Sequence, residues 1–158
     1  MRNKFLIIIV ISMLFICLTG CKKSDEGKNL VCTKEDNESY QYEELLGTTY
    51  IIRGMFSKSE KINNYYMQVI MMYNKNIDDK TFDEYVLENE ENVSMFDTSN
   101  NRIKYQTGVD KTNKTISYSM QVSNIDEEFG KSGEVFSSSM YTLKGFKESL
   151  EKSGYKCK

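Results

Sequence analysis

Histidine, the residue type that most often carries acid–base catalysis, is absent from this chain of 158 residues. Histidine is the commonest general base and a common metal ligand, so its absence excludes Ser-His and Cys-His nucleophiles within one chain. Ser149 and Lys152 have the spacing of a serine–lysine pair. They fall at the charged end of an expected helix, where we expect both to be exposed. We therefore predict no catalytic residue and no enzyme activity.

Carboxylates are the second group that could do chemistry, either as acid–base pairs or as calcium ligands. Neither of their two segments has the Asp-x-Asp-x-Asp-Gly spacing of a calcium loop, and the chain has no glycine-rich phosphate loop. We interpret them as a solvated helix face and a polar loop, and we predict neither a metal site nor a cofactor. The carboxylates are Asp83, Glu84, Glu88, Glu90 and Glu91 in one segment, and Asp126, Glu127 and Glu128 in the other.

Tyrosines offer a third kind of site, since the chain has 11 of them and no tryptophan. Tyr65, Tyr66 and Tyr73 could act as platforms that stack against sugar rings. Tyrosine on a pleated strand more often packs in a core or at its edge. Packing is therefore our interpretation of these three residues, and carbohydrate binding is the alternative.

The N-terminal segment has the organisation of a secretory leader. A short basic start precedes residues 5–18, which are almost wholly apolar but too short for a spanning helix of about 20 residues. Leu18-Thr19-Gly20-Cys21 then resembles the lipobox of bacterial lipoproteins. This resemblance implies a signal peptide over residues 1–20, cleavage between Gly20 and Cys21, and a diacylglycerol on the Cys21 thiol. An uncleaved signal anchor or an ordinary secretory leader is the alternative.

The four cysteines divide according to this assignment. Cys17 would leave with the leader and Cys21 would carry the lipid, so Cys32 and Cys157 remain. An even pair outside the cytoplasm predicts a disulfide between them. The alternative is a two-cysteine metal or redox site, but neither residue has a Cys-x-x-Cys partner and there is no histidine.

The net charge limits the partners of the mature chain. Removing residues 1–20 takes away Arg2 and Lys4, which leaves 19 basic and 23 acidic residues among 138. This acidic balance argues against a nucleic-acid partner, because nucleic-acid binding requires a basic surface. Contact with the membrane would instead depend on the diacylglycerol on Cys21. We expect residues 21–29 to form a flexible tether and residues 30–158 to form one monomeric domain.

Segments rich in β-branched and aromatic residues predict the strands of an antiparallel sheet. The last main strand alternates between apolar residues (Ile116, Tyr118, Met120 and Val122) and polar ones, as a strand with one wet face does. Residues 62–73 are apolar on both faces, which predicts a central strand. The main strands form two hairpins, 50–56 with 62–73 and 102–109 with 115–123.

Shorter segments complete the expected sheet. Residues 30–33 and 155–157 predict terminal edge strands, and their pairing would bring Cys157 to Cys32. Residues 34–39 are charged and polar, which predicts a surface loop. Residues 40–46 fit either a short helix or a strand.

Two helices are expected to pack on this sheet. Thr81 and Glu84 have the spacing of a capping box, which predicts an N-cap at Thr81 and a helix over residues 82–93. A second helix is expected over residues 143–152, with Gly154 as its stop signal. Residues 124–139 predict an irregular loop. The fold class is therefore α+β, with an antiparallel sheet of two hairpins plus terminal edge strands and two helices packed on it.

This order of elements, following a lipobox, resembles the YehR-like family of small bacterial lipoproteins. The residues that carry the resemblance are few: Leu30-Val31-Cys32-Thr33-Lys34 at the start of the domain, and Ser153-Gly154-Tyr155-Lys156-Cys157-Lys158 at its end. The resemblance implies a small α+β domain in a family without an assigned activity.

The sequence thus predicts a lipid-anchored protein of the cell membrane that faces outside the cytoplasm. We expect it to bind or assist an envelope protein or glycan without catalysis, which requires an exposed aromatic patch. One alternative is a carboxylate-dependent enzyme acting on envelope polymers, which requires two carboxylates converging in a cleft. Another is a small-ligand carrier, which requires an enclosed apolar cavity between sheet and helices.

Overall fold

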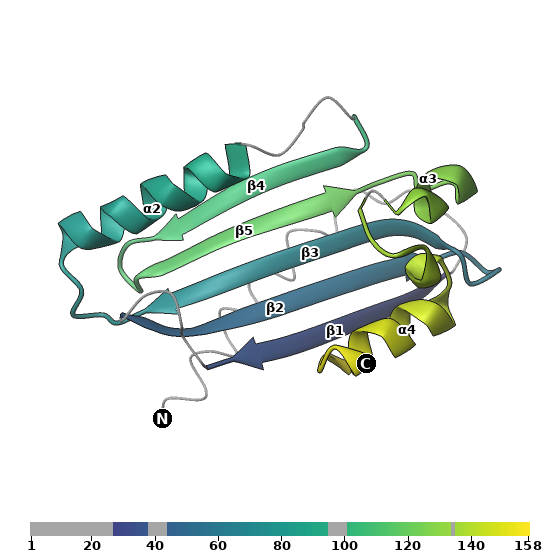
Figure 1. The fold of residues 1–158 in the computed structure, drawn as a ribbon, viewed down its shortest axis with the longest axis horizontal. Helices are drawn as coiled ribbons and strands as arrows, with labels where there is room; N and C mark the ends of the chain where they lie inside the picture. Colours follow the sequence, from purple (N-terminus) through teal and green to yellow (C-terminus); the bar gives the residue numbers. More distant parts are fainter. Residues whose placement is uncertain (1–26, 38–43, 95–100, 134) are drawn as a thin grey trace.

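A computed structural model describes residues 27–37, 44–94, 101–133 and 135–158 of the chain (Figure 1). Its centre is an antiparallel sheet of six strands in the order β4-β5-β3-β2-β1-β6. The predicted α+β class is therefore confirmed. The strands are β1 (Lys28–Asp36), β2 (Leu45–Phe56), β3 (Ile62–Tyr73), β4 (Ile103–Asp110), β5 (Thr115–Val122) and β6 (Lys156–Cys157).

Both predicted hairpins are confirmed, β2 with β3 and β4 with β5. β3 lies between β2 and β5, so the prediction of a central strand is also correct. The segment 40–46, which fitted a helix or a strand, contributes Leu45 and Leu46 to the start of β2, and residues 40–43 lie outside the described ranges.

β1 is longer at both ends than its apolar residues indicated. Its pairing with β2 runs without interruption from Lys28 opposite Phe56 to Asp36 opposite Thr48. Residues 28 and 29 were expected in the tether and residues 34–36 in a loop. The unbroken ladder explains the difference, because pairing with a long neighbouring strand can hold polar residues in a strand.

One face of the sheet carries the core. Residues opposite one another in a ladder share a face, and so do alternate residues along a strand. In the described strands, every buried hydrophobic residue lies on the face that contains Tyr65, Val69 and Tyr73 of β3. These residues are Cys32, Ile52, Phe56, Ile62, Tyr65, Val69, Tyr73, Ile116, Met120 and Val122.

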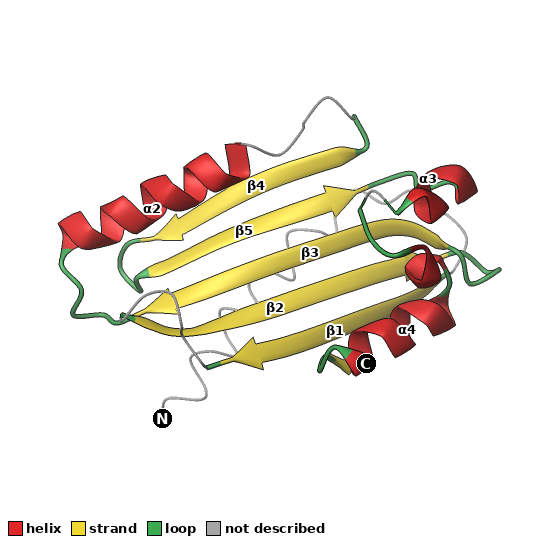
Figure 2. Cartoon of the chain, viewed as in Figure 1, coloured by secondary structure: helices red, strands yellow, loops and turns green. Residues whose placement is uncertain are grey.

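Helices cover this face from its two ends (Figure 2). At one end lies α2 (Asp79–Ser94), and its Phe82 packs edge-on against Tyr73 with the ring centres 5.8 Å apart. At the other end lie α3 (Glu127–Ser132), the short 3-10 helix η1 (Ser138–Tyr141) and α4 (Leu143–Lys152). Phe146 of α4 packs edge-on against Phe56 at 5.4 Å. The buried residues therefore form two clusters, one under each group of helices.

α2 begins at Asp79, three residues before the predicted start, and its cap is not Thr81. The Asp78 carboxylate accepts a hydrogen bond from the Thr81 backbone N–H at 2.9 Å and another from the Thr81 hydroxyl at 2.7 Å. A carboxylate three residues upstream thus satisfies the helix N-terminus, and Thr81 lies inside the first turn.

The prediction of an irregular loop over residues 124–139 is wrong in part, since this segment holds α3 and the start of η1. Asp126 caps α3 by accepting a hydrogen bond from the Phe129 backbone N–H at 2.9 Å. Gly133 ends the helix with a left-handed φ of 81°. Capping residues at both ends hold a helix of only six residues, which is too short to show a periodic pattern.

α4 and its glycine stop are confirmed. Gly154 has a φ of 85°, and its N–H and that of Tyr155 bond to the carbonyls of Glu151 and Leu150, each at 3.0 Å. These two bonds form a Schellman motif. The motif turns the chain back so that β6 pairs with β1, as predicted, and this pairing leaves β1 between β2 and β6.

Candidate functional site

The predicted pairing of Cys32 with Cys157 is present as a disulfide, with a Cα–Cα distance of 4.0 Å. The two residues are ladder partners in β1 and β6, and Cys32 is fully buried. The bond fastens the last strand to the first. Gly20 and Cys21, the predicted cleavage and lipidation residues, lie outside the described residues, so their roles stay predictions.

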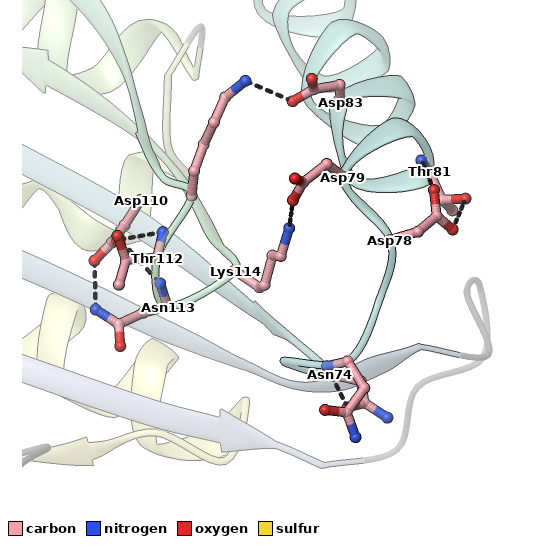
Figure 3. Close-up of polar contacts among 11 residues, drawn as sticks. Asn74, Asp78, Asp79, Thr81, Asp83, Asp110, Thr112, Asn113 and Lys114 are labelled. Carbon is pink, nitrogen blue, oxygen red and sulfur yellow. Dashed lines mark hydrogen bonds and ion pairs between the residues drawn. The ribbon is translucent and has the colours of Figure 1, made fainter.

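Polar side chains gather where the loop after β3 and the β4–β5 turn meet the start of α2 (Figure 3). The Lys114 ammonium group bonds to the Asp79 carboxylate at 2.5 Å, and Lys111 pairs with Asp83 at 2.8 Å. These pairs connect α2 to the turn. Asp83, which sequence reasoning offered for acid–base chemistry, is therefore paired with a lysine and not with a second carboxylate.

The pKa values in this polar cluster favour charged carboxylates. A hydrogen bond from the Thr81 backbone lowers the pKa of Asp78, and a hydrogen bond from Lys114 lowers that of Asp79. The Asn113 side chain lowers the pKa of Asp110 in the same way. A carboxyl group that acts as a general acid needs a raised pKa. These groups therefore have the electrostatics of structural contacts.

The other acidic segment has a similar role. A hydrogen bond from the Phe129 backbone, with a second contribution from Arg102, lowers the pKa of Asp126. Lys131 lowers the pKa of Glu127. In the ranges that the structure describes, no group of three or more cysteine, aspartate or glutamate residues is placed to hold a metal ion.

α4 carries the Ser149 and Lys152 pair. The Ser149 hydroxyl lies 3.3 Å from the Ser139 hydroxyl. Lys152 is exposed, as predicted, whereas Ser149 is half-buried because α4 packs against η1 there. Glu148, Glu151 and Lys152 line an open hollow on this helix. Its charged lining differs from the enclosed apolar cavity that a carrier would need.

The three tyrosines suggested as stacking platforms separate in the structure. Tyr65 and Tyr73 are core residues with exposed fractions of 4% and 1%, so the packing interpretation is confirmed for both. Tyr66 is half-buried on the opposite face of β3. The Arg53 guanidinium carbon lies 5.9 Å from its ring centre, and Arg53 Nε is buried without a hydrogen-bond partner.

A different group of tyrosines meets on the core face. Tyr50 of β2 and Tyr118 of β5 both pair with Val69 of β3, one on each side. Tyr155, after α4, completes the group, and all three tyrosines are half-buried. We call Tyr50, Tyr118 and Tyr155 the tyrosine cluster. Tyr118 was expected to point inward, but the register that brings it near Tyr50 was not available from the sequence.

The phenol groups of the tyrosine cluster influence one another. Burial, followed by the proximity of Tyr50, raises the pKa of Tyr118. Burial, followed by the proximity of Tyr50 and Tyr118, raises the pKa of Tyr155. Within the described residues, none of the three hydroxyls has a hydrogen-bond partner. The phenols of Tyr118 and Tyr155 therefore stay protonated at neutral pH and can donate hydrogen bonds to a ligand.

The fold and this cluster define an α+β domain with a tyrosine-bearing sheet face. Searches found no matching family model, curated protein or solved structure. The resemblance to YehR-like lipoproteins therefore stays a prediction. In the parts of the chain that the structure describes, no helix is long and apolar enough to cross a membrane.

Proposed function

We propose that this chain is a lipid-anchored lipoprotein, displayed outside the cytoplasmic membrane, whose domain binds an envelope component without catalysis. Leu18-Thr19-Gly20-Cys21 supports the anchor, with a diacylglycerol on Cys21 as the membrane contact. Each buried methylene contributes about 0.8 kcal/mol, so two acyl chains give stable attachment. If the chain belongs to the YehR-like family of small lipoproteins, this lipid anchor is what that membership would imply.

The disulfide is consistent with this location, because disulfides persist in oxidising compartments outside the cytoplasm. β1 starts at Lys28, seven positions after Cys21, so an anchor would connect to the sheet through this strand. β1 is paired with β2 on one side and with β6 on the other. A pull on the N-terminal segment would act on a strand that two ladders and the disulfide hold in place.

The observation that carries the binding role is the tyrosine cluster. It places three half-buried tyrosines together, and tyrosine combines an apolar ring with a polar tip, which suits a binding surface. The tyrosine cluster contains no carboxylate, whereas acid–base catalysis by the enzyme alternative requires a pair of them. The domain acts as a monomer in this proposal.

The anchor can be tested by substituting Cys21→Ala in a bacterial host that is fed a labelled fatty acid. We expect the label to disappear and the leader to remain uncleaved, because the acylated thiol is missing. Cys17→Ala is the matched control, since this cysteine lies inside the leader, and it should keep both the label and the cleavage. Persistent labelling of the Cys21→Ala protein would refute the anchor.

A further inference from the structure

The tyrosine cluster lies at the middle of the core face, where side chains of tyrosine, and none of the described helices, cover the buried Val69. Val69 has an exposed fraction of only 3%, yet it belongs to neither cluster of buried residues. α2 reaches one end of the face and α4 the other (Figure 2). The neighbours of Val69 across the ladders are Tyr50 and Tyr118. These two rings therefore form the surface of the sheet at its middle.

A cation lies beside the tyrosine cluster. Lys34 is the ladder partner of Tyr50. Its Cε also lies 3.8 Å from the place that a Cβ on Gly154 would occupy, which puts the Lys34 side chain at the turn that leads to Tyr155. Within the described residues, Lys34 forms no ion pair. Its charge is therefore available to a ligand.

The row of residues that crosses the sheet here contains no carboxylate. In order across the strands it consists of Lys34, Tyr50, Val69, Tyr118 and Thr107. The row offers one ammonium group, two phenols and an exposed hydroxyl. Asp36, two positions along β1 from Lys34, is the carboxylate of the next row on this face. A row of hydrogen-bond donors that itself holds no acid suits a ligand that brings oxygen acceptors and negative charge.

We propose that the tyrosine cluster and Lys34 bind an anionic envelope glycan, whose sugar or polyol units carry carboxylates or phosphates. The C–H surfaces of the units would pack on the tyrosine rings, and their hydroxyls would bond to the phenols. The anionic group would pair with Lys34. This inference rests on the proposed function and adds the ligand class to it.

Calorimetry on the chain as purified from the membranes of a bacterial host, in a neutral detergent, tests the proposal. The carboxylate probe is trigalacturonate and the phosphate probe is a glycerol phosphate trimer, so the two arms distinguish the source of the charge. Maltotriose tests for a neutral sugar and triglutamate for an acidic peptide. Binding of either anionic probe, weakened by added salt, is the expected result.

The variants locate the site. Tyr118→Ala and Lys34→Gln should each weaken binding of the anionic probe at least about tenfold, because they remove a ring and a charged hydrogen bond. Tyr66→Ala is the matched control, since Tyr66 also lies beside a cation, Arg53, but on the opposite face. It should leave the dissociation constant within about twofold of the unsubstituted chain.

Several outcomes would overturn the proposal. These are equal or tighter binding of maltotriose or triglutamate, binding that Lys34→Gln leaves unchanged, or an equal loss in Tyr66→Ala. Tyr118→Phe keeps the ring and should weaken binding less than Tyr118→Ala, so it replaces that variant if the alanine chain fails to fold. Absence of binding by either anionic probe overturns the ligand class. The labelling of Cys21 would still decide the anchor separately.

Discussion

Reduction of the Cys32–Cys157 disulfide should destabilise the domain strongly, and the size of the effect follows from the loop that the bond closes. The two cysteines are separated by 125 positions. A cross-link over a loop of this length removes about 16 cal/mol/K of entropy from the unfolded chain, or about 5 kcal/mol at 25 °C. Residual structure in the unfolded chain would make the loss smaller.

The folded structure should survive reduction. The loss of stability should therefore come mainly from the unfolded chain, which gains entropy when the cross-link is absent. Cys32 and Cys157 are partners in a regular ladder, and the backbone bonds between Val31 and Lys158, at 3.0 and 2.9 Å, do not depend on the sulfur atoms. α4 also keeps Phe146, which is fully buried. Reduction leaves the buried Cys32 sulfur in place, whereas Cys32→Ala would remove packing as well. Cys157→Ala is therefore the better genetic equivalent.

The assay is urea unfolding of the full chain carrying Cys17→Ala and Cys21→Ala. Circular dichroism monitors the unfolding with and without a reductant. A loss of about 5 kcal/mol, with a slope of about 1.5 kcal/mol/M, lowers the midpoint by about 3 M urea. Cys157→Ala should unfold near the midpoint of the reduced chain. If reduced and oxidised chains unfold at the same urea concentration, the loop-closure reasoning is wrong.

Two further predictions concern packing and capping. Phe146→Ala should lower the free energy of unfolding by about 4 kcal/mol in the same urea assay, because the ring is fully buried against Phe56. Lys147 is the exposed neighbour of Phe146, and Lys147→Ala should change the free energy of unfolding by less than about 0.5 kcal/mol. The hydrogen bond from the Thr81 backbone N–H lowers the pKa of Asp78 in the folded chain below its ordinary value of 3.8. The charged Asp78 therefore stabilises the fold above about pH 4, and this stabilisation is lost as the pH falls through the lowered pKa. The melting temperature should therefore drop less between pH 7 and pH 3 for Asp78→Asn than for the unsubstituted chain. An equal drop in the two chains would contradict this role of Asp78.

The elements that the sequence predicted well are those whose signal is local. β3 and β5 show two-residue alternation or long apolar runs, and their observed bounds agree closely with the expected ones. The Gly154 stop is likewise local, because a left-handed φ favours glycine. These signals sufficed for the hairpins, for α4 and for the class of the fold.

The elements that the sequence missed depend on contacts between distant segments or on competing local signals. The polar end of β1 is held by its ladder with β2, which no pattern within β1 reveals. Asp78 and Thr81 are both good capping residues, and a pattern cannot decide between them. The tyrosine cluster joins residues of β2 and β5 with a residue of the turn after α4, so predicting it required the strand register and the path of the chain after α4.

The position of the tyrosine cluster limits what an anchored domain could reach. Lys28 lies seven positions after Cys21, and an extended chain of that length spans at most about 25 Å. Lys34 lies six residues further along β1, which adds about 20 Å at the rise of a strand. If Cys21 carries the lipid, the cluster lies within about 45 Å of the membrane surface. A polymer layer close to the membrane is then within its range, which agrees with a glycan that is itself attached there.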